Sequence, residues 1–411
     1  MRHVIVVHYS LSFNADWETL SNIEGEGCIF HLITDVKVKG HIPGSYLSCF
    51  SSINFLKNFD YIQCRSAVLD IIKTHSIHDL RLIAKDEYSL MIAAKLREEL
   101  GLEGVKPNEI LPFVNKLAMK EIIKKAGITT HKHIRFDNEY YNNYQEKYVD
   151  EIEMNFSYPL FTKPVDSTGS VGTRKIDNRE EFILWCKEHA ECSNYEIDEY
   201  ISGTLYHIDT IIQKGKMVFS FTGKYNRPNA ELLYGFPMGS IVLNESAHEY
   251  KKLQDFNAAV LKSFSTLPDG AFHHEVFVRH DGQIIFLEIA ARAAGGFTPK
   301  MYEKASGINI EEMHFMAQLN KIPSDISVSI KDSAAWIFFP PVKGVIKKCI
   351  NPIDIQGSYE LFWRNTANDK IENPVSCGDR VLGILLWSEQ QREVEKDFYQ
   401  LEKNYIPFEL Y

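Results

Sequence analysis

The chain has 411 residues and a net charge of −10 at neutral pH, with 45% hydrophobic and 24% charged residues. These values are typical of a folded protein of about two to three domains or subdomains. The acidic balance argues against a nucleic-acid partner, because proteins that bind nucleic acids normally carry a basic stripe. The apolar stretches are short and interrupted by charges, so we expect no transmembrane helix and no membrane partner.

The N-terminal sequence MRHVIVVHYS holds an apolar run of only a few residues, which favours a first strand over a signal peptide. The seven cysteines are scattered and form no CxxC pair. This pattern indicates neither a disulfide framework nor a zinc site, and it suits a reducing compartment. We therefore expect a cytoplasmic protein.

The first part of the chain alternates strand-like and helix-like segments, which predicts a parallel α/β domain. Helical periodicity spans residues 67–74 and 89–100, and Gly101 is expected to end the second helix. No GxGxxG pattern follows the first strand, so dinucleotide binding by this domain is weakly supported. Short apolar runs predict strands at residues 4–8, 28–33, 61–63 and 80–84.

A second α/β unit is expected to begin near Pro112, with a helix over residues 116–126 that Gly127 ends. Further helices are predicted at residues 142–155, 180–189 and 248–265. Extended segments are predicted at residues 131–136, 158–163, 174–176, 195–201, 206–213 and 217–224. From Lys321 onward the chain is aromatic and predicted to be rich in strands, at residues 335–339, 346–348 and 381–387.

Two carboxylates lie in two neighbouring strand-like runs. Glu275 belongs to residues 274–278 and Glu288 to residues 284–289, and the turn-forming sequence His-Asp-Gly at 280–282 joins them. Folding this turn back brings the strands side by side, so both carboxylates can meet. Facing carboxylates repel each other, and a Mg²⁺ ion held together with substrate phosphates resolves that repulsion. The alternative is a solvated edge hairpin with an acid on its wet face.

Three further residues favour a site over the solvated hairpin. Arg292 follows four residues after Glu288, and Gly295 and Gly296 come directly behind it. The apolar neighbours of Glu288 add to this argument, because an acid is expensive to bury unless a cation or a donor meets it.

A lysine at a strand end, Lys163, precedes a loop of small residues. Such residues let backbone N–H groups approach an anion, while the lysine supplies the opposite charge. The pattern is not a Walker A motif, and an ordinary hairpin turn is the alternative. The loop residues that we expect near the anion are Ser167, Thr168, Gly169, Ser170, Val171 and Gly172.

Lys116 is a second candidate for an anion contact, since it begins a helix whose first N–H groups also favour phosphate. Its alternative is a solvated lysine on an amphipathic helix. The strand end at Glu199, Tyr200 and Ile201 could hold an adenine edge, or it is simply a strand that leaves a sheet. His207 and Asp209 share one strand face, where a plain polar pair is the alternative to a site.

Taken in order, these features resemble the ATP-grasp superfamily. The helix-start lysine, the strand-end lysine, the small-residue loop, the hinge DEYISG and the two acids with Arg292 all occur in its sequence order. The resemblance covers residues 112–319 strongly and the remaining segments less distinctively. Within the superfamily, the segments EIAARAAGG and PPVKG resemble carboxylate–amine ligases such as bacilysin-type L-amino-acid ligases and carnosine synthase.

The resemblance implies an α/β fold with α+β elements, namely the ATP-grasp fold. It would consist of an N-terminal parallel α/β domain (1–111), a small central lid subdomain with a linker helix (112–203), and a large subdomain (204–411). The last of these would hold an antiparallel sheet and a β-rich C-terminal extension.

The resemblance also implies residue roles. Lys116 and Lys163 would contact the nucleotide phosphates, and the loop would close over the β- and γ-phosphates. Glu199, Tyr200 and Ile201 would hold the adenine. Glu275 and Glu288 would hold Mg²⁺, for which Mn²⁺ can substitute. Arg292 would stabilise the transferring phosphoryl group, and the substrate side is expected to involve Arg292, Gly295, Gly296 and Arg227.

Two departures from the family pattern stand out. Many relatives have an asparagine where this chain has Ala290, which leaves the metal site one protein ligand short. A glutamate that often contacts the ribose is replaced by Leu205, so His207 or Asp209 would take its place.

The activity implied is ADP-forming ligation of a carboxylate to an amine through an acyl phosphate, with an amino acid among the small-molecule substrates. ATP and Mg²⁺ would be required, and a homodimer is a further expectation. Three alternatives are kept: another ATP-grasp ligase or a carboxylase, a nucleotide-binding sensor without catalysis, and an α/β protein whose motifs match by accident.

Overall fold

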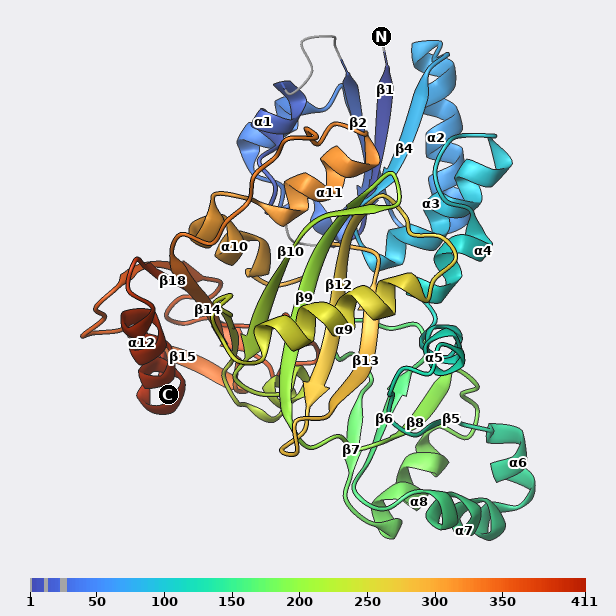
Figure 1. The fold of residues 1–411 in the computed structure, drawn as a ribbon, viewed down its shortest axis with the longest axis vertical. Coiled ribbons are helices and arrows are strands. Elements are labelled where there is room, and N and C mark those ends of the chain that lie inside the picture. The colour runs from blue at the N-terminus through green and yellow to red at the C-terminus, as the bar shows by residue number, and fades with distance from the viewer. Residues whose placement is uncertain (1, 11–13, 23–27) are drawn as a thin grey trace.

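The computed structural model describes residues 2–10, 14–22 and 28–411. Within them the chain forms sheets of four, eight, three and four strands. Figure 1 shows the N-terminal part in blue at the top, the large sheet in the centre, and a small green sheet unit below it. The red C-terminal part flanks the large sheet. No helix among the described residues is long and apolar enough to cross a membrane.

The N-terminal sheet is parallel, as predicted, with the strand order β3-β2-β1-β4. Two helices, α2 (Tyr61–His75) and α3 (Glu87–Glu99), pack on one face of it, and α1 (Trp17–Asn22) lies on the other. The strands are β1 (His3–His8), β2 (Ile29–Asp35), β3 (Ser52–Leu56) and β4 (Leu80–Ala84).

The strand predicted at residues 61–63 is wrong, because these residues form the first turn of α2. The carboxylate of Asp60 accepts a hydrogen bond from the backbone N–H of Gln63 at 2.8 Å and so caps the helix. A three-residue apolar run does not distinguish a strand from one helical turn, whereas this cap does. The third strand of the sheet is β3, which was not predicted.

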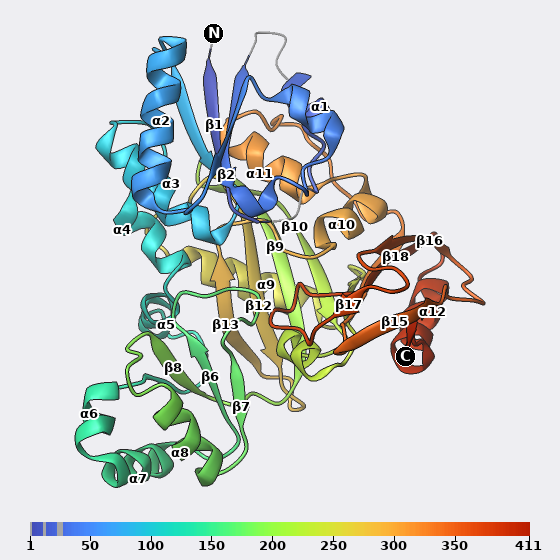
Figure 2. The same cartoon turned by 180° about the vertical axis from the view of Figure 1, so that it is seen from behind.

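The small sheet has the order β5-β8-β6-β7 and is antiparallel. Helix α5 (Lys116–Lys125) leads into it, after the short α4 (Pro107–Ile110). Figure 2 shows its helices on the side away from the N-terminal part. Its elements are β5 (His133–Arg135), α6 (Asn138–Asn143), α7 (Gln145–Asn155), β6 (Leu160–Pro164), β7 (Arg174–Ile176), α8 (Arg179–Glu188) and β8 (Tyr195–Glu199).

The helix predicted over residues 142–155 is two helices, α6 and α7. Tyr144 lies between them with φ −144° and ψ 55°, which is outside the helical region. The core of this unit surrounds Trp185, which is fully buried and packs against Phe136.

The large sheet is antiparallel throughout, with the order β13-β12-β9-β10-β11-β14-β18-β16. Helix α9 (Tyr250–Lys262) crosses one face, while α10 (Thr298–Ser306) and α11 (Ile310–Gln318) pack on the other (Figure 1). The strands are β9 (Thr204–Gln213), β10 (Lys216–Tyr225), β11 (Met238–Val242), β12 (Gly270–Val278), β13 (Ile284–Ala290), β14 (Ser333–Phe339), β16 (Ser358–Trp363) and β18 (Leu382–Ser388).

The C-terminal region combines strands with one long helix that the sequence analysis missed. Strands β15 (Gly344–Cys349), β17 (Lys370–Ile371) and β19 (Phe408–Leu410) form the three-stranded sheet. Helix α12 (Gln391–Asn404) packs on β14 and β18 through Val394, Phe398 and Leu401. These apolar residues recur at helical spacing, so the signal was present in the sequence.

Candidate functional site

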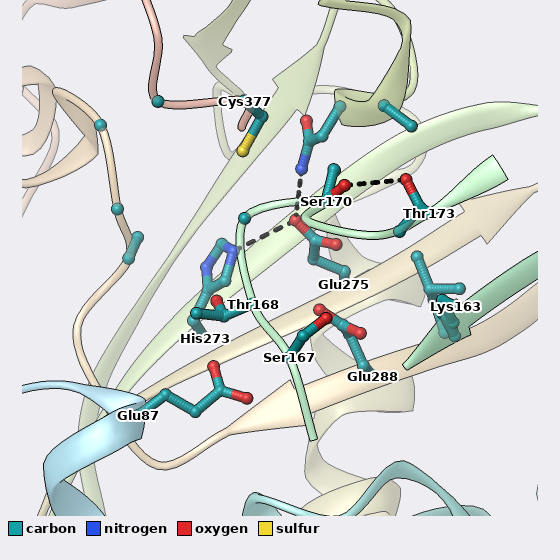
Figure 3. A pocket seen from close by; sticks show the side chains of 18 of the residues that line it. Glu87, Lys163, Ser167, Thr168, Ser170, Thr173, His273, Glu275, Glu288 and Cys377 are labelled. Atoms are coloured by element: carbon teal, nitrogen blue, oxygen red, sulfur yellow. Dashed lines mark hydrogen bonds and ion pairs between the residues drawn. The ribbon is translucent and has the colours of Figure 1, made fainter. Parts of the chain in front are cut away.

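A cavity of about 530 Å³ opens between the N-terminal sheet, the small sheet and the large sheet (Figure 3). It brings together most of the residues that the sequence analysis singled out. Those that line it are Lys116, Lys163, Ser167, Thr168, Gly169, Ser170, Glu199, Tyr200, Ile201, Glu275, Glu288, Arg292, Gly295 and Gly296.

The two carboxylates are direct cross-strand partners in this cavity. Glu275 of β12 pairs with Glu288 of β13 in the antiparallel register, next to an irregularity between Glu275 and Val276. Figure 3 shows both side chains in the same part of the cavity. Burial alone would raise the pKa of Glu288, but Lys116, Lys163 and Arg292 hold it below its ordinary value. Glu288 is therefore kept ionised as an oxygen donor.

The side chain of Glu275 is oriented by two polar neighbours, Asn229 and His273. Its Oε1 accepts a hydrogen bond from Nδ2 of Asn229 at 2.8 Å and lies 3.2 Å from Nε2 of His273. These contacts fix one carboxylate oxygen from two different segments. Two carboxylates with oxygens directed into a cavity of cationic side chains are a donor set that suits Mg²⁺ carried on phosphates.

Behind Glu275 runs a buried chain of hydrogen bonds. Nδ1 of His273 lies 2.7 Å from Oδ1 of Asp209, and the other oxygen of Asp209 lies 2.5 Å from Nδ1 of His207. Burial lowers the pKa of His273, but Asp209 and Glu275 outweigh burial and raise it to about 9. Tyr302 also donates to Asp209, at 2.7 Å.

His207, Asp209 and His273 carry ligand atoms close enough together to be considered for a metal ion. Their contacts of 2.5 and 2.7 Å are hydrogen-bond distances, and Asp209 is the shared acceptor. The three side chains therefore form a support for Glu275 and not a second ion site.

Arg292 connects three parts of the molecule. Its Nε donates to Oε2 of Glu87 at 3.1 Å, and one terminal nitrogen donates to Oγ1 of Thr168 at 3.1 Å. Burial lowers the pKa of Arg292, but the carboxylates of Glu87 and Glu288 outweigh burial and raise it. The guanidinium thus stays charged beside the paired carboxylates, and it ties α3 to the small-residue loop.

The two predicted lysines enter from different elements. Lys116 begins α5, whose N-terminus is capped by the side chain of Asn115. Its Nζ donates to the carbonyl oxygen of Ser167 and lies 4.0 Å from Oε2 of Glu288. Lys163, on β6, lies 3.1 Å from Oδ2 of Asp198. Both lysines line the cavity, and both help to lower the pKa of Glu288.

The small-residue loop requires unusual backbone conformations. Gly169, Ser170 and Gly172 all have positive φ, at 68°, 58° and 74°. A Cβ on Gly172 would lie 3.0 Å from both Cγ of Pro164 and the hydroxyl of Tyr195. The loop also reaches the C-terminal region, because the backbone N–H of Cys377 donates to the carbonyl oxygen of Gly169 at 2.9 Å.

The strand end at Glu199, Tyr200 and Ile201 borders an apolar part of the cavity. The carboxylate of Glu199 accepts a hydrogen bond from Arg279 at 2.7 Å, so its side chain is directed toward the turn that follows β12. The apolar residues that line this part are Phe161, Leu205, Phe277 and Leu287. This region can accommodate a flat, weakly polar ring system.

A second apolar wall lies beyond the carboxylate pair. Tyr225, Met238, Trp336 and Phe338 line it, and all four are buried. Gly296 packs against this wall, since a Cβ there would lie 3.2 Å from the ring of Trp336, and its φ is +63°. The Gly295–Gly296 segment therefore borders this apolar wall of the cavity.

Five predicted site residues lie outside the cavity lining: Val171, Gly172, His207, Asp209 and Arg227. His207 and Asp209 are fully buried in the chain behind Glu275, so the expected ribose contact has no counterpart in the described lining. Arg227 is held by Glu231 and Glu402 at 3.2 and 2.6 Å. Ala290 is also buried and does not reach the cavity.

Several residues that contact the site were not predicted from the sequence. His273 stands two residues before Glu275, so the alternation of β12 could have placed it on the same face. Glu87 follows the carboxyl end of β4, where parallel sheets commonly place functional residues. Asn229 carries no local signal, because it reaches Glu275 only through the fold.

Part of the chain matches a known domain family, and the similar proteins include amino-acid ligases. Residues 156–300 match the model of the ATP-grasp domain. An L-arginine-specific L-amino acid ligase of Bacillus subtilis is 23% identical over 349 residues, which cover 82% of this chain and 81% of that enzyme. A D-alanine--D-alanine ligase of Bacillus pumilus is 22% identical over 200 residues, covering 45% of this chain and 52% of its own.

Solved structures share the fold along the whole chain. The L-amino acid ligase from Bacillus licheniformis has a TM-score of 0.78 at 16% identity, over 100% of this chain and 99% of its own. An N5-carboxyaminoimidazole synthetase from Staphylococcus aureus, complexed with ADP, has a TM-score of 0.69 at 14% identity. The match covers 98% of this chain and 97% of that protein. The predicted ATP-grasp fold is confirmed, and the chain is similar to L-amino acid ligases in sequence and in fold, as the resemblance indicated.

Proposed function

We propose, from the premise that this chain carries an ATP-grasp domain of the carboxylate–amine ligase type, that it joins an amino acid to an amine at the expense of ATP. The observation that carries the proposal is the cross-strand pair of Glu275 and Glu288 beside Arg292, with Lys116 and Lys163 opposite. A cation-lined cavity around two paired carboxylates is suited to polyphosphate with Mg²⁺.

The proposed reaction has two steps. A carboxylate oxygen of the acid substrate attacks the γ-phosphorus of ATP, the bond to the β-phosphate oxygen breaks, and ADP leaves. The amine nitrogen then attacks the carbonyl carbon of the acyl phosphate, the carbon–oxygen bond to phosphate breaks, and inorganic phosphate leaves. The nitrogen loses a proton as the amide forms.

The residues of this chain act mainly by position and charge. Lys116 and Lys163 would bind phosphate oxygens, and the loop around Thr168 would cover them. Arg292 would bind the phosphoryl group in transfer and then the acyl phosphate, because it stands between the loop and the carboxylate pair. Preorganised cations stabilise developing negative charge without reorganisation during the reaction.

Mg²⁺ would be held by Glu275 and Glu288, with phosphate oxygens and water completing its coordination. The ion would neutralise phosphate charge when bound. Asn229 would orient Glu275 by donating a hydrogen bond to it, and water or phosphate would take the place of the ligand that Ala290 does not offer. Mn²⁺ can replace Mg²⁺ in this proposal, since both prefer oxygen ligands.

The nucleotide base is proposed to lie against Tyr200 and Ile201, between the apolar residues of the small and large sheets. The acid substrate would then occupy the opposite end, where Arg292 and the Gly295–Gly296 segment precede the wall of Tyr225 and Trp336. That wall carries no free carboxylate among the described lining residues, which favours a substrate with an apolar or aromatic side chain.

The setting of the protein is part of the same proposal. Its substrates are small molecules, with neither nucleic acid nor membrane involved, and it acts in the cytoplasm as a homodimer. The acidic composition supports the absence of a nucleic-acid partner, and the free thiols at Cys64, Cys186 and Cys377 support a reducing compartment. The homodimer is proposed from the resemblance to the family alone.

The decisive experiment is phosphate release with Mg-ATP across pairs of amino acids, with mass spectrometry on the products. We expect release that requires both an amino acid and an amine, and an amide product of matching mass. Release that requires bicarbonate instead would identify a carboxylase. Binding of Mg-ATP without turnover under any acceptor would identify a sensor, and either result would contradict the proposal.

A further inference from the structure

Beneath the cavity lies a buried cluster of charged side chains that the sequence analysis did not recognise. We call it the lysine cluster. Lys120 and Glu196 have no exposed surface, and the other members are at most 5% exposed. Its members are Lys120, His131, Lys163, Glu196 and Asp198.

Lys120 is the centre of the lysine cluster. Its Nζ donates to Oε1 of Glu196 at 2.9 Å and to the two oxygens of Asp198 at 2.9 and 3.1 Å. The side chain comes from α5, four residues after Lys116, and it does not reach the cavity. Lys120 therefore has no route to a phosphate group.

Lys163 shares the same two carboxylates but also faces the cavity. Its Nζ lies 3.1 Å from Asp198 and 3.5 Å from Glu196. Nε2 of His131 lies 2.9 Å from Asp198, and burial lowers the pKa of this histidine to about 4, so it is neutral. The lysine cluster thus contains two ammonium groups and two carboxylates, and its charges balance.

The balance of charges in the lysine cluster would change if the ammonium group of Lys163 turned toward a phosphate. Two buried carboxylates without a cation are strongly unfavourable. Burial alone would raise the pKa of Asp198, but Lys120 and Lys163 hold it well below its ordinary value. Oε2 of Glu196 is buried without a hydrogen-bond partner, so the lysine cluster is short of donors even with both lysines present.

We infer that Lys120 is a positioning residue: it neutralises Asp198 and Glu196 from behind, and so frees the ammonium group of Lys163 to bind the nucleotide phosphates. Without Lys120, the two carboxylates would retain Lys163 as their one cation. This inference rests on the proposed binding of ATP in the cavity.

A purely structural role for Lys120 makes a different prediction from a positioning role. If Lys120 only held the fold together, loss of Glu196 would harm the protein in the same way as loss of Lys120. In the positioning role the two substitutions act in opposite directions, because Glu196→Gln removes one of the carboxylates that compete for Lys163.

The test is calorimetric titration of Mg-ATP into the full chain and three variants, with Lys125→Met as a control on the exposed face of α5. We expect Lys120→Met to raise the dissociation constant at least about tenfold. Glu196→Gln should leave it unchanged or lower it. The double variant Lys120→Met/Glu196→Gln restores the charge balance and should bind close to wild type.

Two results would overturn the inference: wild-type affinity in Lys120→Met, or an equal loss of affinity in Glu196→Gln and Lys120→Met. If Lys120→Met does not fold, the isosteric Glu196→Gln decides, since weakened binding there contradicts the positioning role. If wild type itself does not bind Mg-ATP, both the proposed function and this inference fail. That outcome differs from failure of the inference alone, because then no protein in the series binds Mg-ATP.

Discussion

The carboxylate of Glu87 accepts a hydrogen bond from Nε of Arg292 at 3.1 Å, although 205 residues separate them along the chain. Glu87 is the first residue of α3, directly after its cap Asp86, while Arg292 follows β13. The N-terminal sheet thus contributes to the same site as the large sheet. This contact fixes the direction of the guanidinium toward Thr168 and the carboxylate pair.

Glu87→Gln should reduce turnover by about tenfold to a hundredfold, because a misplaced Arg292 loses its geometry toward the reacting phosphoryl group. The dissociation constant for Mg-ATP should change little. Steady-state phosphate release and calorimetry measure the two quantities. Glu98→Gln, on the exposed side of the same helix, is the matched control. An unchanged turnover would show that Arg292 is positioned without Glu87.

Arg292→Ala should have a larger effect, lowering the rate of phosphoryl transfer by about 10²–10³-fold, since a preorganised cation at the transferring group is lost. ADP formation in a single turnover measures this step directly. Arg392→Ala is a suitable control, because that side chain is exposed on α12 and does not line the cavity. A normal rate in Arg292→Ala would assign this arginine a structural role only.

Glu288→Gln should lower the rate of ADP formation at least about a hundredfold while the protein remains folded, because a neutral amide is a poorer ligand for a divalent cation. In titrations with Mg²⁺ or Mn²⁺ at fixed ATP, the variant should need a higher concentration of the metal ion for half-maximal activity than wild type does. Circular dichroism checks the fold. Turnover like that of wild type would remove Glu288 from the metal site.

Gly172→Ala should weaken Mg-ATP binding and destabilise the closed loop. Alanine at φ +74° costs about 1 kcal/mol, and its Cβ would also press on Pro164 and Tyr195. Gly215→Ala, in the turn between β9 and β10, is the matched control, since Gly215 has φ +68° but no atom within 4 Å of the added Cβ. Equal effects of both substitutions on nucleotide affinity would contradict a special role for the loop.

Glu312 gives a prediction on pH. Burial and nearby carboxylates raise its pKa to about 7 in the folded protein, against 4.5 for the ordinary side chain. The folded state therefore binds more protons than the unfolded state between these values, and this contribution to stability is lost as the pH rises from 4.5 through 7. Glu312→Gln should flatten the fall of the unfolding temperature over that range, as measured by thermal scans. A profile parallel to that of wild type would show that Glu312 titrates normally.

Much of the site was predictable because its signals are local. The turn at 280–282 joins two strand-like runs, and it sets Glu275 opposite Glu288. The helix start at Lys116 and the strand end at Lys163 are also local features. The strand predicted at residues 61–63 was wrong, because three residues carry too little periodicity to distinguish a strand from a helix. The helix cap at Asp60 was the stronger local signal.

The sequence by itself determined which residue types this protein brings to the site and on which elements they stand. Only the tertiary structure decided which buried charges meet. Asn229 reaches Glu275 from 46 residues away, and Lys120 reaches Asp198 across 78. A charged side chain can be buried when an oppositely charged group or a hydrogen-bond partner is buried beside it. That pairing depends on how distant segments pack, and no local pattern of residues encodes it.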